Sequence, residues 1–199
     1  MIVFPTCKIN LGLQILRKRA DGYHDLDTCF YAIPWTDILE IVPAQTLSFQ
    51  ATGAQIAGNP DTNLCLRAYH ALQKDYALPP VSIHLHKIIP MGAGLGGGSS
   101  DGAHTLRLLN AIFSLQLPAE KLMDYAAQLG SDCAFFVQDQ PMRGTGRGEV
   151  LSPLHVSLTG KFLLVIKPDI HVSTAEAYRG VTPHVPLQSV PEILQLPID

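Results

Sequence analysis

Residues 90–102 read Pro90-Met91-Gly92-Ala93-Gly94-Leu95-Gly96-Gly97-Gly98-Ser99-Ser100-Asp101-Gly102, and a pattern of helical period opens directly on the two serines. Glycine adopts positive φ angles and lets the backbone approach a ligand closely, because it has no Cβ. The N-terminus of a helix adds unpaired N–H groups and the positive end of the helix dipole. Together these features predict a cradle for phosphate oxygens, and hence a site for a nucleotide polyphosphate.

The surrounding sequence distinguishes between kinds of glycine-rich segment. A P-loop has a lysine after its glycines, and none follows here, so that class is excluded. The dinucleotide fingerprint G-x-G-x-x-G is present behind the strand-like residues 81–86, at Gly92, Gly94 and Gly97. That fingerprint also requires a βαβ unit, whereas the helical pattern at 99–115 is followed by a second one at 118–129. A flexible linker is disfavoured as well, because a linker would be polar on both sides and would not begin a helix.

The composition is that of a globular protein. The chain has 199 residues, of which 47% are apolar and 16% charged, enough for one full domain and part of another. The net charge of −3 gives no electrostatic footprint for nucleic acid or for an anionic membrane. The longest apolar runs are too short to span a bilayer, and the start of the chain lacks the features of a signal peptide. We therefore expect a cytoplasmic protein whose partner is a small molecule.

The four cysteines are widely separated and have no histidine partner at metal-ligand spacing. This pattern is typical of reduced, buried thiols rather than of a disulfide framework or a zinc site. We expect no metal site made by protein side chains alone.

Hydrophobic periodicity predicts a mixed α/β fold. Alternating apolar and polar residues predict a strand from Lys8 to Ile15, which a basic turn at 17–22 follows. Further strands are expected at 27–33, 37–42, 81–86, 133–137 and 161–167. Helices are expected after a cap at Asp61 or Thr62, over 99–115 and 118–129, and from a capping box at 173–176. Residues 144–149 read as a glycine-rich turn.

The same pattern predicts two domains of unequal size. The first, at residues 1–155, holds the glycine-rich loop. The second, at residues 156–199, begins with the expected strand at 161–167 and is then interrupted by prolines. One strand and little helix are too few to close a core, so we expect this domain to be incomplete and its apolar residues 162–166 to be left uncovered.

Phosphoryl transfer needs a cradled nucleotide, a carboxylate near the attacking hydroxyl and cations near the transferred group. Asp132 follows a helix end, where a catalytic carboxylate and a local cap are equally good interpretations. Lys8 suits the cation, although taken alone a solvated lysine on an edge strand is the simpler interpretation. Tyr23 and His24 follow an Asp-Gly turn and suit a nucleobase site, or Tyr23 simply packs over the hairpin.

The loop PMGAGLGGGSSDGA at residues 90–103 resembles the glycine-serine loop of the kinases related to galactokinase, homoserine kinase and mevalonate kinase, the GHMP superfamily. The resemblance implies a two-domain fold whose N-terminal part is a mixed-sheet α/β sandwich. It also implies ATP and Mg²⁺, with Ser99 and Ser100 assisting phosphate or Mg²⁺ binding. The residues that would bind ATP are Pro90, Met91, Gly92, Ala93, Gly94, Leu95, Gly96, Gly97, Gly98, Ser99 and Ser100.

Other segments resemble one branch of this superfamily, which acts in the non-mevalonate isoprenoid pathway. They occur in the order of that branch, at residues 8–11, 21–24, 130–136, 144–149 and 172–174. The resemblance implies an ATP-dependent kinase that phosphorylates the tertiary 2-hydroxyl of a methylerythritol linked to cytidine diphosphate. Asp132 would take the proton from that hydroxyl, and Lys8 would keep Asp132 ionised and offset the developing charge. The acceptor would be bound by Asn10, Tyr23, His24 and Thr174, with Tyr23 and His24 at the cytosine.

The sequence departs from the superfamily after Lys167, where nothing resembles its second glycine-rich segment. Beside the leading interpretation, three alternatives stay open. The first is another GHMP kinase that acts on a sugar or on homoserine, and the second is a dinucleotide-dependent oxidoreductase, which only Gly92, Gly94 and Gly97 support. The third is a nucleotide-binding fragment that is inactive without a full second domain. Residues 21–24 argue against the first alternative, because those acceptors carry no nucleobase.

Overall fold

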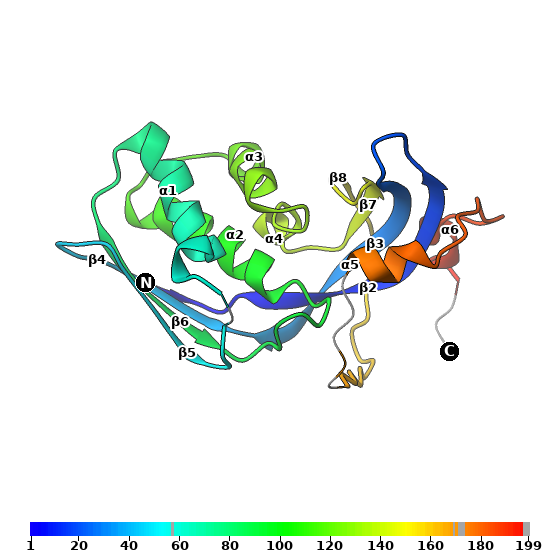
Figure 1. Cartoon of the computed structure of the whole chain (residues 1–199), viewed down its shortest axis with the longest axis horizontal. Helices are drawn as coiled ribbons and strands as arrows, with labels where there is room; N and C mark the ends of the chain where they lie inside the picture. Colours follow the sequence, from blue (N-terminus) through cyan, green and yellow to red (C-terminus); the bar gives the residue numbers. More distant parts are fainter. Residues whose placement is uncertain (57, 169, 171–173, 197–199) are drawn as a thin grey trace. The chain divides into compact units, whose positions relative to one another are not determined.

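The computed structural model describes residues 1–56, 58–168, 170 and 174–196, and Figure 1 shows the course of the chain. The chain divides into two compact units: residues 1–9 with 32–140, and residues 10–31 with 141–199. Two long strands, β2 (Thr6–Lys18) and β3 (His24–Thr36), contribute residues to both units.

The first unit is built on a four-stranded mixed sheet. Its order is β1 (Ile2–Val3), β4 (Ile38–Pro43), β6 (Val81–Lys87) and β5 (Ser48–Gly53), with β5 parallel to β6 and the other neighbours antiparallel. Alternate residues of β6 are buried, from Val81 to Lys87, and those between them are half-buried. This alternation is that of a sheet covered on one face.

Helices α1 (Leu64–Tyr76), α2 (Gly97–Ile112) and α3 (Ala119–Leu129) lie together on one side of this sheet (Figure 1). Helix α2 packs against both of the others. Gly102 lets α1 and α2 approach closely, because a Cβ at this position would lie 3.0 Å from Cβ of Leu64. A short 3₁₀ helix, η1 (Pro60–Thr62), precedes α1, and a single-turn helix, α4 (Phe135–Gln138), follows α3.

The second unit contains the other antiparallel sheet. In the order β2-β3-β7-β8, β7 (Met142–Gly146) and β8 (Val150–Pro153) follow the two long strands. Two short helices, α5 (Thr174–Arg179) and α6 (Val190–Ile193), also belong to this unit. Val190 of α6 is buried, and its Cγ2 lies 3.2 Å from the place of a Cβ on Gly12.

The mixed α/β class with two sheets is confirmed, and so are the predicted strands near residues 8–15, 27–33, 37–42 and 81–86. Helix α2 begins two residues earlier than expected, at Gly97, and ends earlier, at Ile112. Helix α1 is capped by Asn63, whose Oδ1 accepts from the N–H of Cys65, rather than by Asp61 or Thr62, which lie in η1. Ser173 of the predicted capping box lies outside the described residues.

Two predicted strands are wrong. Residues 133–137 form a turn and α4, because a run of five apolar residues has no periodicity that separates a buried strand from a buried helix. Residues 161–167 form no strand, and their side chains are exposed. An apolar run becomes a strand only when another strand edge pairs with it, and these residues pair with none of the described strands.

All four cysteines are buried and reduced, as predicted. Burial raises the pKa of the thiols of Cys7, Cys29 and Cys133 to about 11, so these groups stay protonated and unreactive near neutral pH. Among the described residues, no helix is both long enough and apolar enough to cross a membrane.

Candidate active site

The loop between β6 and α2 has the backbone that its glycines predict. Gly92, Gly94 and Gly96 all have positive φ angles, between 67° and 72°. At Gly96 a Cβ would lie 3.0 Å from the ring of Phe136 and 3.2 Å from Cγ of Lys8. At Gly97 it would lie 2.8 Å from Nζ of Lys87. Glycine is therefore required at position 96 by both backbone conformation and space, and at position 97 by space.

The N-terminus of α2 opens on a cavity. Gly96 occupies the N-cap position without a side chain to accept from the first N–H groups, and no described side chain caps the helix in its place. Gly98 lines a cavity of about 300 Å³, together with Phe49, Asn59, Asn63, Met91 and Asp101. The cavity thus combines apolar walls with polar groups at the positive end of a 16-residue helix.

A buried charged triad lies beside this cavity, and two of its members, Lys87 and Asp101, line it. Lys87 bonds to the carboxylates of both Asp37 and Asp101, with 2.8 Å between Nζ and Oδ2 of Asp101. Oδ1 of Asp37 also accepts from the backbone N–H of Ile89 at 2.8 Å, which fixes the start of the loop. Oδ1 of Asp101 is buried and has no hydrogen-bond partner among the described residues. Burial raises the pKa of Asp101 to about 7, although the charge of Lys87 opposes this rise.

Lys8 and Asp132 meet beside the glycine loop. The Nζ of Lys8 lies 3.5 Å from Oδ2 of Asp132, and the two side chains are 7% and 36% exposed. The backbone N–H of Lys8 donates to the carbonyl of Leu95 at 2.9 Å, which ties this part of β2 to the loop. Asp132 follows α3 in the turn that leads to α4. The structure therefore brings together three elements that the sequence analysis had singled out separately.

The two serines of the loop differ in their surroundings. Ser100 is fully buried, and its hydroxyl lies 3.3 Å from Nδ1 of His104 within α2. Ser99 is half-buried. Ser99 is thus better placed than Ser100 to meet a ligand at the helix N-terminus.

The residues predicted to bind the acceptor lie in the second unit. The amide of Asn10 donates to Oγ1 of Thr28 at 2.8 Å, and Thr28 in turn donates to the carbonyl of Gly12. Tyr23 is 56% exposed. The ring of His24 lies 5.3 Å from that of Tyr178, at an angle of 35°. Thr174 begins α5, but its side chain is outside the described part of the chain.

Four residues that lie beside the predicted site residues were not themselves predicted from the sequence: Lys87, Asp101, Asn63 and Tyr178. Asp101 was the easiest of these to notice, because an acidic residue inside the first turn and a half of a buried helix needs a cationic partner. Tyr178 belongs to α5, the helix that Thr174 begins. Nothing in the local pattern indicates that Lys87 is buried at the end of β6.

Comparison with known proteins agrees with this geometry. Residues 63–140 match the family described as GHMP kinases N terminal domain. The 4-diphosphocytidyl-2-C-methyl-D-erythritol kinases of Cytophaga hutchinsonii and Bacteroides fragilis are each 50% identical to this chain. Each match covers all of this chain and 74% of the relative's own length. A crystal structure titled 4-(cytidine 5'-diphospho)-2C-methyl-D-erythritol kinase matches 98% of this chain and 70% of its own, with a TM-score of 0.81 and 33% identity.

The mixed sheet under three helices, the glycine-rich loop and these matches define a GHMP kinase, an ATP-dependent kinase of small molecules. Within that class the chain belongs to the 4-diphosphocytidyl-2-C-methyl-D-erythritol kinase family, whose members serve isoprenoid biosynthesis.

Proposed function

We propose that this chain transfers the γ-phosphoryl group of ATP to the tertiary 2-hydroxyl of 4-diphosphocytidyl-2-C-methyl-D-erythritol. The observation that carries the proposal is the ion pair of Lys8 and Asp132, held against the loop through the bond between Lys8 and Leu95. A carboxylate, an ammonium group and a phosphate cradle are the parts that phosphoryl transfer to an alcohol requires.

The triphosphate of ATP would lie along the loop, at the uncapped N–H groups of α2. The base and ribose would occupy the cavity beside Gly98. The side chains of Asn59, Asn63 and Asp101 line the same cavity and give it polar groups for the base and ribose.

Asp132 would act as the base that takes the proton of the acceptor hydroxyl. A tertiary alcohol is a weak acid and a crowded nucleophile, so it gains from a base that is already positioned. Lys8 would keep a positive charge beside this carboxylate and beside the negative charge that develops during transfer. Its ammonium group is largely removed from water, which strengthens both interactions.

Mg²⁺ would arrive with the nucleotide. The described residues contain no cluster of three or more His, Cys, Asp or Glu side chains that could hold a metal ion. Mg²⁺ usually keeps several water ligands and binds through substrate phosphates with few protein groups, so such a cluster is not required. Ser99 is the loop residue whose hydroxyl fits this role, and the ion would supply charge neutralisation for the transferred phosphoryl group.

Tyr23 and His24, with Tyr178 beside His24, would hold the cytosine of the acceptor. Aromatic rings stack on any nucleobase, and the ring nitrogens of histidine can bond to its edge. Asn10 would bond to the acceptor, and Thr174 would lie near it. The nucleotide part of the acceptor would then serve as a remote handle that positions the reacting hydroxyl.

The role of Asp132 is tested by Asp132→Asn, which removes the base but keeps the size of the side chain. We expect kcat to fall by about 10²–10⁴, the usual contribution of a general base, while the Kd of an ATP analogue stays close to that of the unchanged chain. Turnover near the original rate would remove Asp132 from this role.

Calorimetry followed by an assay separates this proposal from the alternatives. The proposed kinase binds both ATP and the cytidylylated acceptor and turns them over, whereas an inactive fragment binds ATP without turnover. Binding of NAD(P)H in place of ATP would support a dinucleotide-dependent enzyme, and turnover of a sugar or homoserine would indicate another GHMP kinase.

A further inference from the structure

Arg147 lies over the ring of Tyr23. Its guanidinium carbon is 4.9 Å from the centre of that ring, within the distance of a cation–π contact. Arg147 belongs to the turn between β7 and β8, and Tyr23 to the turn between β2 and β3, so both are residues of the second unit. Tyr23 remains 56% exposed beside this contact, which leaves more than half of its surface available to a ligand.

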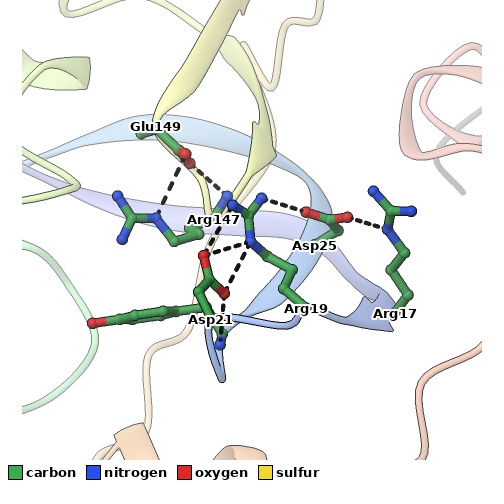
Figure 2. Close-up of polar contacts among 7 residues, drawn as sticks. Arg17, Arg19, Asp21, Asp25, Arg147 and Glu149 are labelled. Atoms are coloured by element: carbon green, nitrogen blue, oxygen red, sulfur yellow. Dashed lines mark hydrogen bonds and ion pairs between the residues drawn. The ribbon is translucent and has the colours of Figure 1, made fainter.

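Arg147 is itself held in place by Glu149. The Nε of Arg147 lies 3.6 Å from Oε1 of Glu149, and the backbone N–H of Arg147 donates to Oε2 of the same carboxylate. Figure 2 shows these two contacts at the β7–β8 turn. Gly146 has a φ of +67°, and a Cβ there would lie 2.9 Å from the Glu149 carboxylate. The turn is thus folded around Glu149, and this fold directs Arg147 toward Tyr23.

The backbone of Tyr23 is fixed from the other side. Its N–H donates to Oδ1 of Asp21 at 3.1 Å, which closes an Asx turn. Arg19 holds the Asp21 carboxylate at 3.0 Å and also bonds to Asp25, to which Arg17 is paired (Figure 2). Charged contacts therefore fix the turn that carries Tyr23, and Arg147 fixes its ring.

We infer that Arg147 is a positioning residue for the nucleobase of the acceptor: it covers one face of Tyr23 and thereby presents the ring, already ordered, to a pyrimidine nucleoside diphosphate. This inference rests on the proposed function, in which Tyr23 holds that base. An exposed tyrosine ring that is free to rotate loses rotational entropy when it stacks on a ligand. A guanidinium group stacks flat on an aromatic face and removes most of that cost in advance.

The inference is tested by titrating cytidine 5′-diphosphate into the chain by calorimetry. We expect Arg147→Ala to raise the Kd about two- to five-fold, the size of one exposed cation–π contact, with the Kd of an ATP analogue unchanged. Arg147→Lys keeps a cation over the ring and should retain part of this affinity. The matched control is Lys18→Ala, which removes the same charge from an exposed side chain of the hairpin that carries Tyr23 but takes no part in the charged contacts that fix its turn.

A second measurement needs no ligand. With ¹³C-labelled tyrosine rings, the resonance of Tyr23 is assigned by its loss in Tyr23→Phe. We expect Arg147→Ala to move that resonance toward the position of a freely rotating ring and Lys18→Ala to leave it in place, while the other tyrosine resonances report that the fold is intact.

The outcomes separate the inference from the function on which it rests. Equal weakening by Arg147→Ala and Lys18→Ala would mean that only net charge matters and would overturn the positioning role. If Tyr23→Ala abolishes binding of cytidine 5′-diphosphate but Arg147→Ala does not weaken it, the positioning role falls and the nucleobase site stands. If Tyr23→Ala leaves binding unchanged, both the nucleobase site and the role of Arg147 are wrong.

Discussion

Asp101 is 2% exposed and shares the ammonium group of Lys87 with Asp37. Two carboxylates then face one cation, and one oxygen of Asp101 lacks a partner among the described residues. Such an arrangement is costly in a low-dielectric interior, which is why burial raises the pKa of this carboxyl group to about 7 from its ordinary 3.8. Asp101 also lines the cavity in which we propose that the nucleotide binds.

The raised pKa of Asp101 predicts a pH dependence of stability. Between about pH 4 and pH 7 the folded state keeps a proton on Asp101 that the unfolded state has lost, so the free energy of unfolding falls as the pH rises. One proton gives a slope of at most about 1.4 kcal/mol per pH unit. Asp101→Asn removes this contribution and keeps the shape of the side chain. Urea unfolding of both proteins from pH 4 to 8 measures the difference.

The comparison between the two proteins is needed because other carboxyl groups titrate in the opposite sense. Arg19 lowers the pKa of Asp21, and Arg17 and Arg19 lower that of Asp25. The stabilising contribution of these two carboxylates to the free energy of unfolding is therefore lost as the pH falls. They are unchanged in Asp101→Asn and cancel from the difference. Identical pH profiles for the two proteins would show that Asp101 is ionised throughout this range.

At the scale of elements, the β6–α2 loop joins both parts of the candidate site. Its backbone contacts Lys8 through Leu95, and its glycines leave room for Phe136, Lys8 and Lys87. The loop is therefore a packed element with a defined conformation rather than a flexible cover. The three side chains that pack against its glycines come from three different elements, α4, β2 and β6.

This packing predicts that Gly96→Ala weakens nucleotide binding, because it distorts the loop itself. At a φ of +68° an alanine is strained by about 1–3 kcal/mol, and its Cβ would press on Phe136 and Lys8. We expect the Kd of an ATP analogue to rise about ten-fold or more, measured by calorimetry. Gly180→Ala is the control, because nothing described lies within 4 Å of the new Cβ and no positive φ is involved. Equal affinity in both variants would contradict the role of the loop.

At the scale of the whole molecule, one buried carboxylate joins distant parts of the chain within the second unit. Asp27 on β3 accepts two hydrogen bonds from Arg143 on β7, at 2.7 and 2.9 Å, and one from the N–H of Val190 on α6 at 3.1 Å. These elements are far apart in sequence. The carboxylate therefore holds the C-terminal helix to the sheet.

Asp27→Asn should destabilise the fold, because it leaves the Arg143 guanidinium without its charged partner. Breaking a fully buried pair costs about 3–5 kcal/mol, but Arg143 is 35% exposed, so we expect about 1–2 kcal/mol. The free energy of urea unfolding measures this change. Asp21→Asn is the matched control, since Asp21 also accepts two bonds from one arginine and one from a backbone N–H, but its side chain is 45% exposed, where ion pairs contribute little. A similar loss in both variants would count against a special role for Asp27.

The division of the chain into domains at residue 155 stays a prediction, as do the roles of Asp132, Lys8, Tyr23 and His24. The chain spans about three-quarters of the length of the relatives that it matches. Its fold was nevertheless accessible from sequence, because β2, β4, β6, α1 and α3 all follow local patterns of period two or 3.6.

The amino-acid order by itself determined the backbone of the glycine-rich loop, the helix behind it and the class of the fold, since φ angles, helix ends and hydrophobic periods are set by neighbouring residues. Only the tertiary structure decided that Lys8 pairs with Asp132, that Lys87 is buried between two carboxylates, and that residues 133–137 form a turn and the start of helix α4. Those outcomes depend on which distant groups arrive at the same place. A charged side chain or a short apolar run takes its final environment from its partners, and local sequence does not name them.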